Sequence, residues 1–265
     1  MARPGLRVSR LSAVAEHHFT SGDLTLAAHL ELPETGGEGV PGVLIIHGFP
    51  AGPRGGANSP STLPELASRI ATEMGWVAMV PHLRGMEGSE GYFSLDGWRD
   101  DVQAAAVDLL DRPRVDGVWA IGFGTGAALA VCAAARETRI RGVGALAAPA
   151  DWSEWVAEPR RLLIHARRAG IVPGDEVTGG FEEWAAAFGD LAAERAAPDL
   201  AGRALLVVHG TEDDVVSPLE ARALAAAHGA ADLRLIEGAG HHLRHDPRAI
   251  AVLLGWLDRQ RRLAG

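Results

Sequence analysis

The spacing of apolar residues changes repeatedly along this chain between strand-like and helix-like periods. Residues 25–32 (TLAAHLEL) alternate as a half-exposed strand does, whereas residues 42–47 (GVLIIH) form the unbroken apolar run of a buried strand. Further strands are predicted at residues 76–81, 118–121, 142–147, 204–209 and 232–237, and helices at about 61–75, 97–111, 127–135, 218–228 and 246–262. Alternating strands and helices of this length predict an α/β fold, with a mostly parallel sheet of about eight strands and helices on both faces.

One stretch interrupts this alternation. Residues 151–199 show helical patterns but no strand, and they carry the aromatic side chains Trp152, Trp155, Phe181 and Trp184. We therefore predict an α/β core formed by residues 1–150 and 200–265, with residues 151–199 inserted as a short helical cap. The alternative is an elaborated connection with no part in substrate access. The tryptophans are expected first as the core of the cap and only second as a wall of a binding site.

The segment after the strand at 118–121 has unusual chemistry. Gly122-Phe123-Gly124-Thr125-Gly126 lies between an apolar strand and an Ala-rich helix, which is the strand–turn–helix setting of a G-x-S-x-G nucleophile elbow. The central position, where the attacking hydroxyl belongs, is occupied by Gly124. Glycine has no heteroatom, so no acyl-enzyme can form at this position. Glycine also tolerates the positive φ that such a sharp turn requires.

Other predicted strands also end in polar or glycine-rich segments. These are HGF at 47–49, RGMEGS at 84–89, HGTED at 209–213 and GAGH at 238–241. Ligands of open α/β sheets bind at the carboxyl ends of the strands. Together with the elbow, the order and spacing of these segments resemble the α/β-hydrolase family, in its serine-hydrolase or dienelactone-hydrolase-like branch, from about residue 24 to 257.

The resemblance implies roles for an acid and a histidine. The family pattern His-Gly-x-x-Asp places the acid at Asp213, with Asp214 as the neighbouring alternative. The histidine corresponds to His241, with His242 as its alternative. The implied site is thus a His–Asp pair at an elbow that has Gly124 as its nucleophile position.

The resemblance also implies an oxyanion hole. Its donors are backbone amides, so they do not depend on side-chain identity, and they correspond to the amides of Phe49 and Thr125. Such a donor is worth roughly 3–4 kcal/mol in hydrolases. These amides would remain available although Gly124 carries no hydroxyl.

Other residues fit the position of the missing nucleophile poorly. Thr125 is expected to point toward helix packing and Cys132 to lie in the core, whereas Ser59 and Ser61 are only candidates to line a pocket. The histidines His47 and His209 are expected to be structural. Asp100 and Asp101 are expected to favour the first turn of their helix, and the acids at 87, 90 and 96 to be solvated. The spacing of the histidines at 241, 242 and 245 does not match a zinc motif, so we predict no metal and no cofactor.

Composition narrows the classes of partner. The chain has 25 basic and 34 acidic residues, a net charge of −9, which argues against a nucleic-acid partner. A single cysteine cannot form an internal disulfide, no apolar run reaches the roughly 20 residues of a membrane span, and residues 1–10 lack the apolar region of a signal peptide. We therefore expect a cytoplasmic protein whose partner is a small molecule, with no membrane partner; the oligomeric state is not predicted.

Three hypotheses of function follow. In the first, an enzyme of hydrolase type acts on a small carbonyl or ester compound, with His241 as the base, Asp213 as its partner and no covalent intermediate. In the second, the same pocket binds a ligand without turnover, as in a regulatory pseudo-hydrolase. In the third, Gly124 replaces the serine of an ordinary serine hydrolase.

Overall fold

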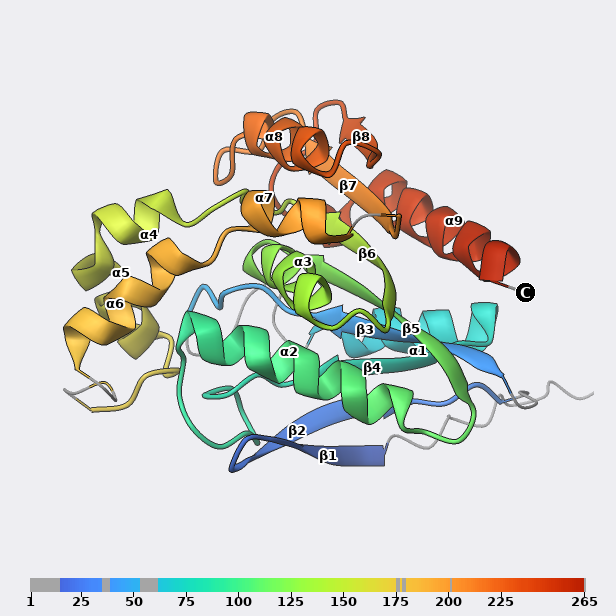
Figure 1. Ribbon diagram of the computed structural model, residues 1–265, viewed down its shortest axis with the longest axis horizontal. Helices are drawn as coiled ribbons and strands as arrows, with labels where there is room; N and C mark the ends of the chain where they lie inside the picture. Colours follow the sequence, from blue (N-terminus) through green and yellow to red (C-terminus); the bar gives the residue numbers. More distant parts are fainter. Residues whose placement is uncertain are drawn as a thin grey trace, which may run out of the picture.

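A computed structural model describes residues 15–34, 39–52, 62–174, 177, 180–200 and 202–264. In this part of the chain, eight strands form one sheet in the order β1-β2-β4-β3-β5-β6-β7-β8 (Figure 1). The strands are β1 (Ala15–Ser21), β2 (Leu24–Glu31), β3 (Val40–Ile46), β4 (Val77–Pro81), β5 (Val115–Phe123), β6 (Ile140–Leu146), β7 (Ala204–Gly210) and β8 (Asp232–Ile236). β2 pairs antiparallel with both β1 and β4, and the other neighbours are parallel. The prediction of a mostly parallel sheet of about eight strands is confirmed.

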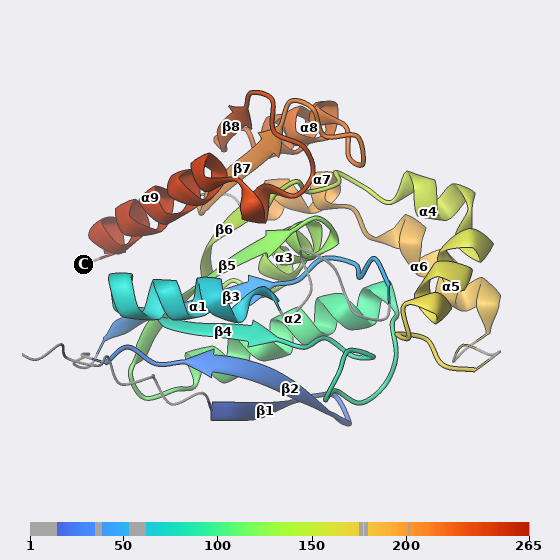
Figure 2. The same cartoon turned by 180° about the vertical axis from the view of Figure 1, so that it is seen from behind.

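Helices cover both faces of the sheet (Figures 1 and 2). One face carries α2 (Leu95–Leu110), α3 (Thr125–Arg136) and α8 (Pro218–His228), and the other carries α1 (Pro64–Arg69) and α9 (Pro247–Ala264). The central strand β3 shows why its sequence is continuously apolar. Leu44 and Ile46 join the core under α2 and α3, whereas Val43 and Ile45 join the core under α1 and α9. All four side chains are fully buried, as expected for a strand covered on both faces.

Two elements differ from the sequence prediction. β1 was not predicted, because its sequence AEHHFTS is mostly polar; it lies at the edge of the sheet and pairs only with β2. The helix predicted at about 61–75 begins at Pro64, and its last part, η2 (Ile70–Met74), is π-helical. It ends at Gly75, which has a φ of +72°, a conformation that favours glycine.

The segment between β6 and β7 is helical and, among the described residues, contains no strand. α4 (Ser153–Ala157), α5 (Pro159–Arg168) and α6 (Phe181–Asp190) lie together beside one end of the sheet (Figures 1 and 2). The last part of the segment, α7 (Ala193–Ala196) and η3 (Ala197–Leu200), instead packs against α3 and α8. The helices that resemble a cap are therefore α4 to α6, and a cap function for residues 151–199 stays a prediction.

Aromatic side chains fix this helical segment to the core. Trp152 and Trp184 are almost fully buried, which fits the prediction that they form the interior of the segment. The Trp184 indole donates to the carbonyl oxygen of Phe93, just before α2, at 3.0 Å, and the two rings pack edge to face. No helix among the described residues is both long enough and apolar enough to cross a bilayer.

Candidate functional site

The glycines at the end of β5 form a tight turn between strand and helix. Gly124 has φ +56° and ψ −127° and is the N-cap of α3, and its amide donates to the carbonyl oxygen of Leu146 on β6 at 2.9 Å. A Cβ atom at Gly122 would lie 2.5 Å from the carbonyl oxygen of Gly126. A Cβ atom at Gly126 would overlap the carbonyl oxygen of His47. Close backbone approach thus requires glycine at positions 122 and 126, and the positive φ at position 124 favours glycine there. The sharp turn between strand and helix is thus present at Gly124, and its role as a nucleophile elbow stays a prediction.

Asp213 and His241 form a hydrogen-bonded pair near this turn. Oδ1 of Asp213 accepts from the amides of Val215 and Val216, both at 2.9 Å, and Oδ2 accepts from Nδ1 of His241 at 3.0 Å. Burial alone would raise the pKa of Asp213, but the hydrogen bonds from His209, His241 and the two amides outweigh it. They hold the pKa well below its ordinary value. Asp213 is therefore an ionised acceptor at neutral pH.

Close packing of two loops brings these residues together. A Cβ atom at Gly210, the last residue of β7, would overlap the carbonyl oxygen of Ala239, so the loop after β8 lies directly against the end of β7. The amide of Glu212 donates to Ala239 O at 2.9 Å, and the amide of Thr211 donates to Ile236 O at 3.1 Å. These backbone contacts fix the loop that carries Asp213 next to the loop that carries His241.

The free nitrogen of His241 faces Gly124. Because a carboxylate only accepts, the proton between His241 and Asp213 is on Nδ1, and Nε2 of the neutral ring carries a lone pair. A Cβ atom at Gly124 would lie 3.5 Å from Nε2 and 3.8 Å from Cε1 of His241. Apart from the chain neighbours of Gly124, no other described atom would come within 4 Å of it. A nitrogen lone pair is thus directed at the position where a side chain of residue 124 would begin.

A cavity of about 400 Å³ extends from this position. Phe49 and Thr125, the two residues expected to supply oxyanion amides, both line it, as do Gly124 and His241. Thr125 is the first residue of α3, where backbone amides have no partner within the helix and favour negative charge. The other walls of the cavity include residues from the helical segment, from the loop before α8 and from α8 itself: Trp152, Trp155, His165, Val215 and Glu220.

His47 supports the segment that carries Phe49. The fully buried imidazole donates from Nδ1 to the carbonyl oxygen of Gly48 at 2.9 Å and accepts from the amide of Leu83 at Nε2 at 3.3 Å. Burial lowers the pKa of His47 to about 4, so the ring is neutral near pH 7. These contacts fit the structural role that we expected for this histidine.

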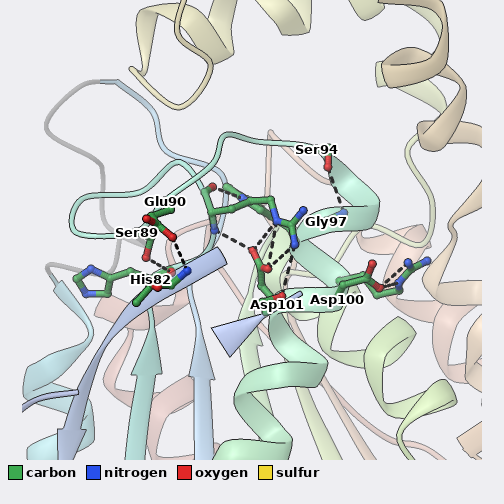
Figure 3. Close-up of polar contacts among 12 residues, drawn as sticks. His82, Ser89, Glu90, Ser94, Gly97, Asp100 and Asp101 are labelled. Carbon is green, nitrogen blue, oxygen red and sulfur yellow. Dashed lines mark hydrogen bonds and ion pairs between the residues drawn. The ribbon is translucent and has the colours of Figure 1, made fainter. Parts of the chain in front are cut away.

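The loop after β4 is held by a buried ion pair (Figure 3). Oδ1 of Asp101 accepts from Nη2 of Arg84 at 2.7 Å, and Oδ2 accepts from the Arg84 amide at 2.8 Å. Asp101 is fully buried, so the prediction that it simply favours the first turn of its helix is wrong. The acids at 87, 90 and 96 are exposed, as expected, and Glu90 also accepts from the Thr25 amide at 2.6 Å. This network fixes the loop on which Leu83 contacts His47.

The structure also distinguishes the alternative site residues. Asp214 is exposed, and His242 is exposed at the rim of the cavity, with its ring centre 5.6 Å from that of His241. Burial raises the pKa of Cys132 to about 12, so its thiol is protonated at neutral pH. Ser59 and Ser61 lie outside the described residues. Among the described residues, no cluster of three or more His, Cys, Asp or Glu side chains is arranged to hold a metal ion.

Sequence reasoning missed two features of the site. Glu220, near the start of α8, lines the cavity and accepts from the amide of Ala150 at 2.7 Å. His165 on α5 also lines the cavity, and its Nε2 lies 3.2 Å from the carbonyl oxygen of Pro50. Both residues lie on helices that reach the site only through tertiary packing, and no local motif marks them.

Solved structures of similar fold cover nearly the whole chain. Est1E from Butyrivibrio proteoclasticus, solved with bound ferulic acid, is 19% identical over 94% of this chain and 100% of its own, with a TM-score of 0.71. The alpha/beta hydrolase GrgF from Penicillium sp. sh18 is 18% identical over 94% of this chain and 98% of its own, with a TM-score of 0.70. Acetyl xylan esterase 1 from Thermoanaerobacterium sp. JW/SL YS485 is 18% identical over 88% of this chain and 80% of its own, with a TM-score of 0.62. No protein-family model and no curated protein sequence matches the chain. The similarity to these hydrolases and esterases, together with the sheet described above, shows that the chain has the α/β-hydrolase fold.

Proposed function

We propose that this protein is an enzyme that hydrolyses a small ester or related carbonyl compound without a covalent intermediate. The observation that carries the proposal is the position of His241 Nε2, which is 3.5 Å from where a Cβ atom of residue 124 would lie. On its other side the same ring donates to Asp213 at 3.0 Å. A base with an oriented lone pair therefore faces the nucleophile position, and Gly124 leaves that position accessible to a water molecule.

The reaction needs one proton acceptor and one anion site. A water oxygen attacks the carbonyl carbon while Nε2 of His241 takes its proton, and Asp213 stabilises the imidazolium that forms. The amides of Phe49 and Thr125 donate to the oxyanion of the tetrahedral intermediate. When the intermediate collapses, the bond to the leaving oxygen breaks and His241 returns its proton to the alkoxide. The products are a carboxylic acid and an alcohol.

The cavity indicates the size and character of the substrate. Its volume of about 400 Å³ lies in the range of sites for small molecules, roughly 300–1,000 Å³. Phe49, Trp152 and Trp155 give it apolar aromatic walls. We propose that residues 151–199 act as a cap that supplies two of these aromatic walls, and that the substrate is small and partly apolar.

The proposal is tested by turnover of a panel of esters. Acetyl esters and ferulate esters are suitable, because the similar folds include an acetyl xylan esterase and a protein that binds ferulic acid. A positioned general base contributes typically 10²–10⁴-fold, so His241→Gln should lower kcat/KM by this factor on any ester that the parent hydrolyses. His228→Gln is the matched control, because that histidine is the last residue of α8, bonds to the Arg203 carbonyl and does not line the cavity.

Two results would contradict the proposal. Equal rates for the parent and His241→Gln would show that His241 is not the base. Binding of an ester or of its acid product without any turnover over hours would show instead a ligand-binding protein, which is the second hypothesis from the sequence.

A further inference from the structure

Asp213 has a second histidine partner that the proposed reaction does not use. His209, one residue before the end of β7, is fully buried. Its Nε2 lies 3.2 Å from Oδ2 of Asp213 and 2.9 Å from the carbonyl oxygen of Val216. Oδ2 of Asp213 is therefore shared by two imidazoles, His209 and His241.

The surroundings of His209 determine which of its nitrogens carries the proton. Both partners of Nε2 are acceptors, a carboxylate and a carbonyl oxygen, so Nε2 must donate. Nδ1 is buried and has no hydrogen-bond partner among the described residues. If Nδ1 were protonated as well, the ring would be a cation with a buried N–H that has no acceptor. This costs more free energy than a buried nitrogen lone pair without a donor. His209 is therefore a neutral ring whose Nε2–H donates to the carbonyl oxygen of Val216 at 2.9 Å and lies 3.2 Å from Oδ2 of Asp213.

Asp213 has hydrogen bonds that do not involve His209. Its other oxygen, Oδ1, accepts from the amides of Val215 and Val216, and these bonds belong to the backbone of its own loop. His209 takes part in neither of these two bonds, although its own hydrogen bond is to the carbonyl oxygen of Val216 in the same loop. Removal of His209 changes the surroundings of Oδ2, which would then have His241 as its only imidazole neighbour among the described residues.

We propose that His209 is a positioning residue that weakens the hold of Asp213 on the protonated form of His241. The positive end of the His209 N–H dipole lies 3.2 Å from Oδ2 and reduces the negative potential that this oxygen presents to His241. This keeps His241 in its neutral, proton-accepting form over a wider pH range. The consequence for catalysis rests on the proposed function, whereas the effect on ionisation follows from the geometry and can be measured without a substrate.

Other ionisable groups around His241 come from several elements. His242 lies beside it, and the cavity that it faces is also lined by side chains from the start of the helical segment, from α5 and from α8: Asp151, Glu154, His165 and Glu220. None of these groups is changed by a substitution at position 209, so a comparison of variants isolates the contribution of His209.

The test is a pH titration of the His241 ring by NMR, with ¹⁵N-labelled histidine in the full chain. In His209→Phe, which keeps a ring but removes the donor, the midpoint of the His241 titration should rise by about 0.4–1 pH unit. A rise of this size is roughly a 2.5- to 10-fold change in the protonation equilibrium of His241. His228→Phe is the control and should leave the midpoint unchanged, because His228 bonds to the Arg203 carbonyl and not to Asp213.

The sign of the shift separates our inference from a merely structural role. If His209 only held Asp213 in place, its removal would loosen the pair and lower the midpoint. An unchanged or lowered midpoint in a folded His209→Phe variant overturns the proposal.

A measurement on the unsubstituted protein applies even if that variant does not fold. The ¹⁵N shifts of His209 should show a neutral ring protonated at Nε2 at pH 7, and an Nδ1-protonated or charged ring would also overturn the inference. If no ester is turned over but the midpoint rises in His209→Phe, the proposed function fails and this inference stands.

Discussion

Replacing Gly124 with serine tests the geometry of the elbow in the most direct way. The new Cβ atom would lie 3.5 Å from Nε2 and 3.8 Å from Cε1 of His241, which is ordinary van der Waals contact, so no neighbour has to move. The cost comes from the backbone, because φ is +56° and ψ is −127°. A residue held in such a conformation costs about 1–3 kcal/mol. For a chain of this size each kcal/mol lowers the melting temperature by about 2–4 °C.

The hydroxyl extends the side chain by one bond and brings Oγ within the about 2.6–3.2 Å hydrogen-bond range of Nε2. We expect a fluorophosphonate probe to label Gly124→Ser and not the parent, as measured by intact mass. Gly124→Ala is the matched control, since it has the same backbone strain and Cβ atom but no nucleophile. It should be destabilised equally and remain unlabelled. A folded Gly124→Ser variant that resists the probe, or labelling of the parent, would refute the reasoning.

Three further predictions concern stability. Asp101→Ala leaves its arginine partner without a counter-ion and should lower the free energy of unfolding in urea by about 3 kcal/mol. Glu73→Ala, at the exposed pair with Arg69, should change it by less than about 1 kcal/mol. Equal effects would contradict a structural role for the buried pair. Gly126→Ala introduces a Cβ atom that overlaps a backbone oxygen and should lower the free energy of unfolding by about 1–3 kcal/mol. Gly255→Ala, in open space within α9, should raise it by about 0.5–1 kcal/mol. An unchanged free energy of unfolding in Gly126→Ala would show that the turn packs less closely. The pKa of His47 is lowered to about 4, so the unfolded chain binds more protons between pH 4 and 6.5 and stability falls as the pH decreases through this window. The parent should lose about 2 kcal/mol more than His47→Leu between pH 7 and pH 5, and parallel losses would place the titration elsewhere.

The sequence was most informative where the sheet is covered on both faces. Short continuous apolar runs such as those of β3 and β7 favour buried strands, and the alternation of strands with helices predicts their parallel order. β1 could not be found in this way. Its polar sequence is stabilised by pairing with β2 along its whole length, which is a long-range contact and not a local preference.

The site was predictable to the extent that its parts lie in motifs. Gly124, Asp213 and His241 follow strands in a recognisable order, and their proximity results from the parallel sheet. The choice of Asp213 over Asp214 agrees with the hydrogen bond to His241. Burial of Asp101 and the contribution of Glu220 to the cavity depend on which elements pack together, and no local spacing encodes either.

The central claim is that His241 activates water directly at the Gly124 position. The most direct test is the intact mass of the parent, quenched during turnover of an ester, together with the product formed in the first turnover. The account predicts an unmodified mass and linear product formation without a burst, with a rate 10²–10⁴-fold above that of His241→Gln. An acyl adduct on any residue, or a burst equal to the enzyme concentration, would contradict it.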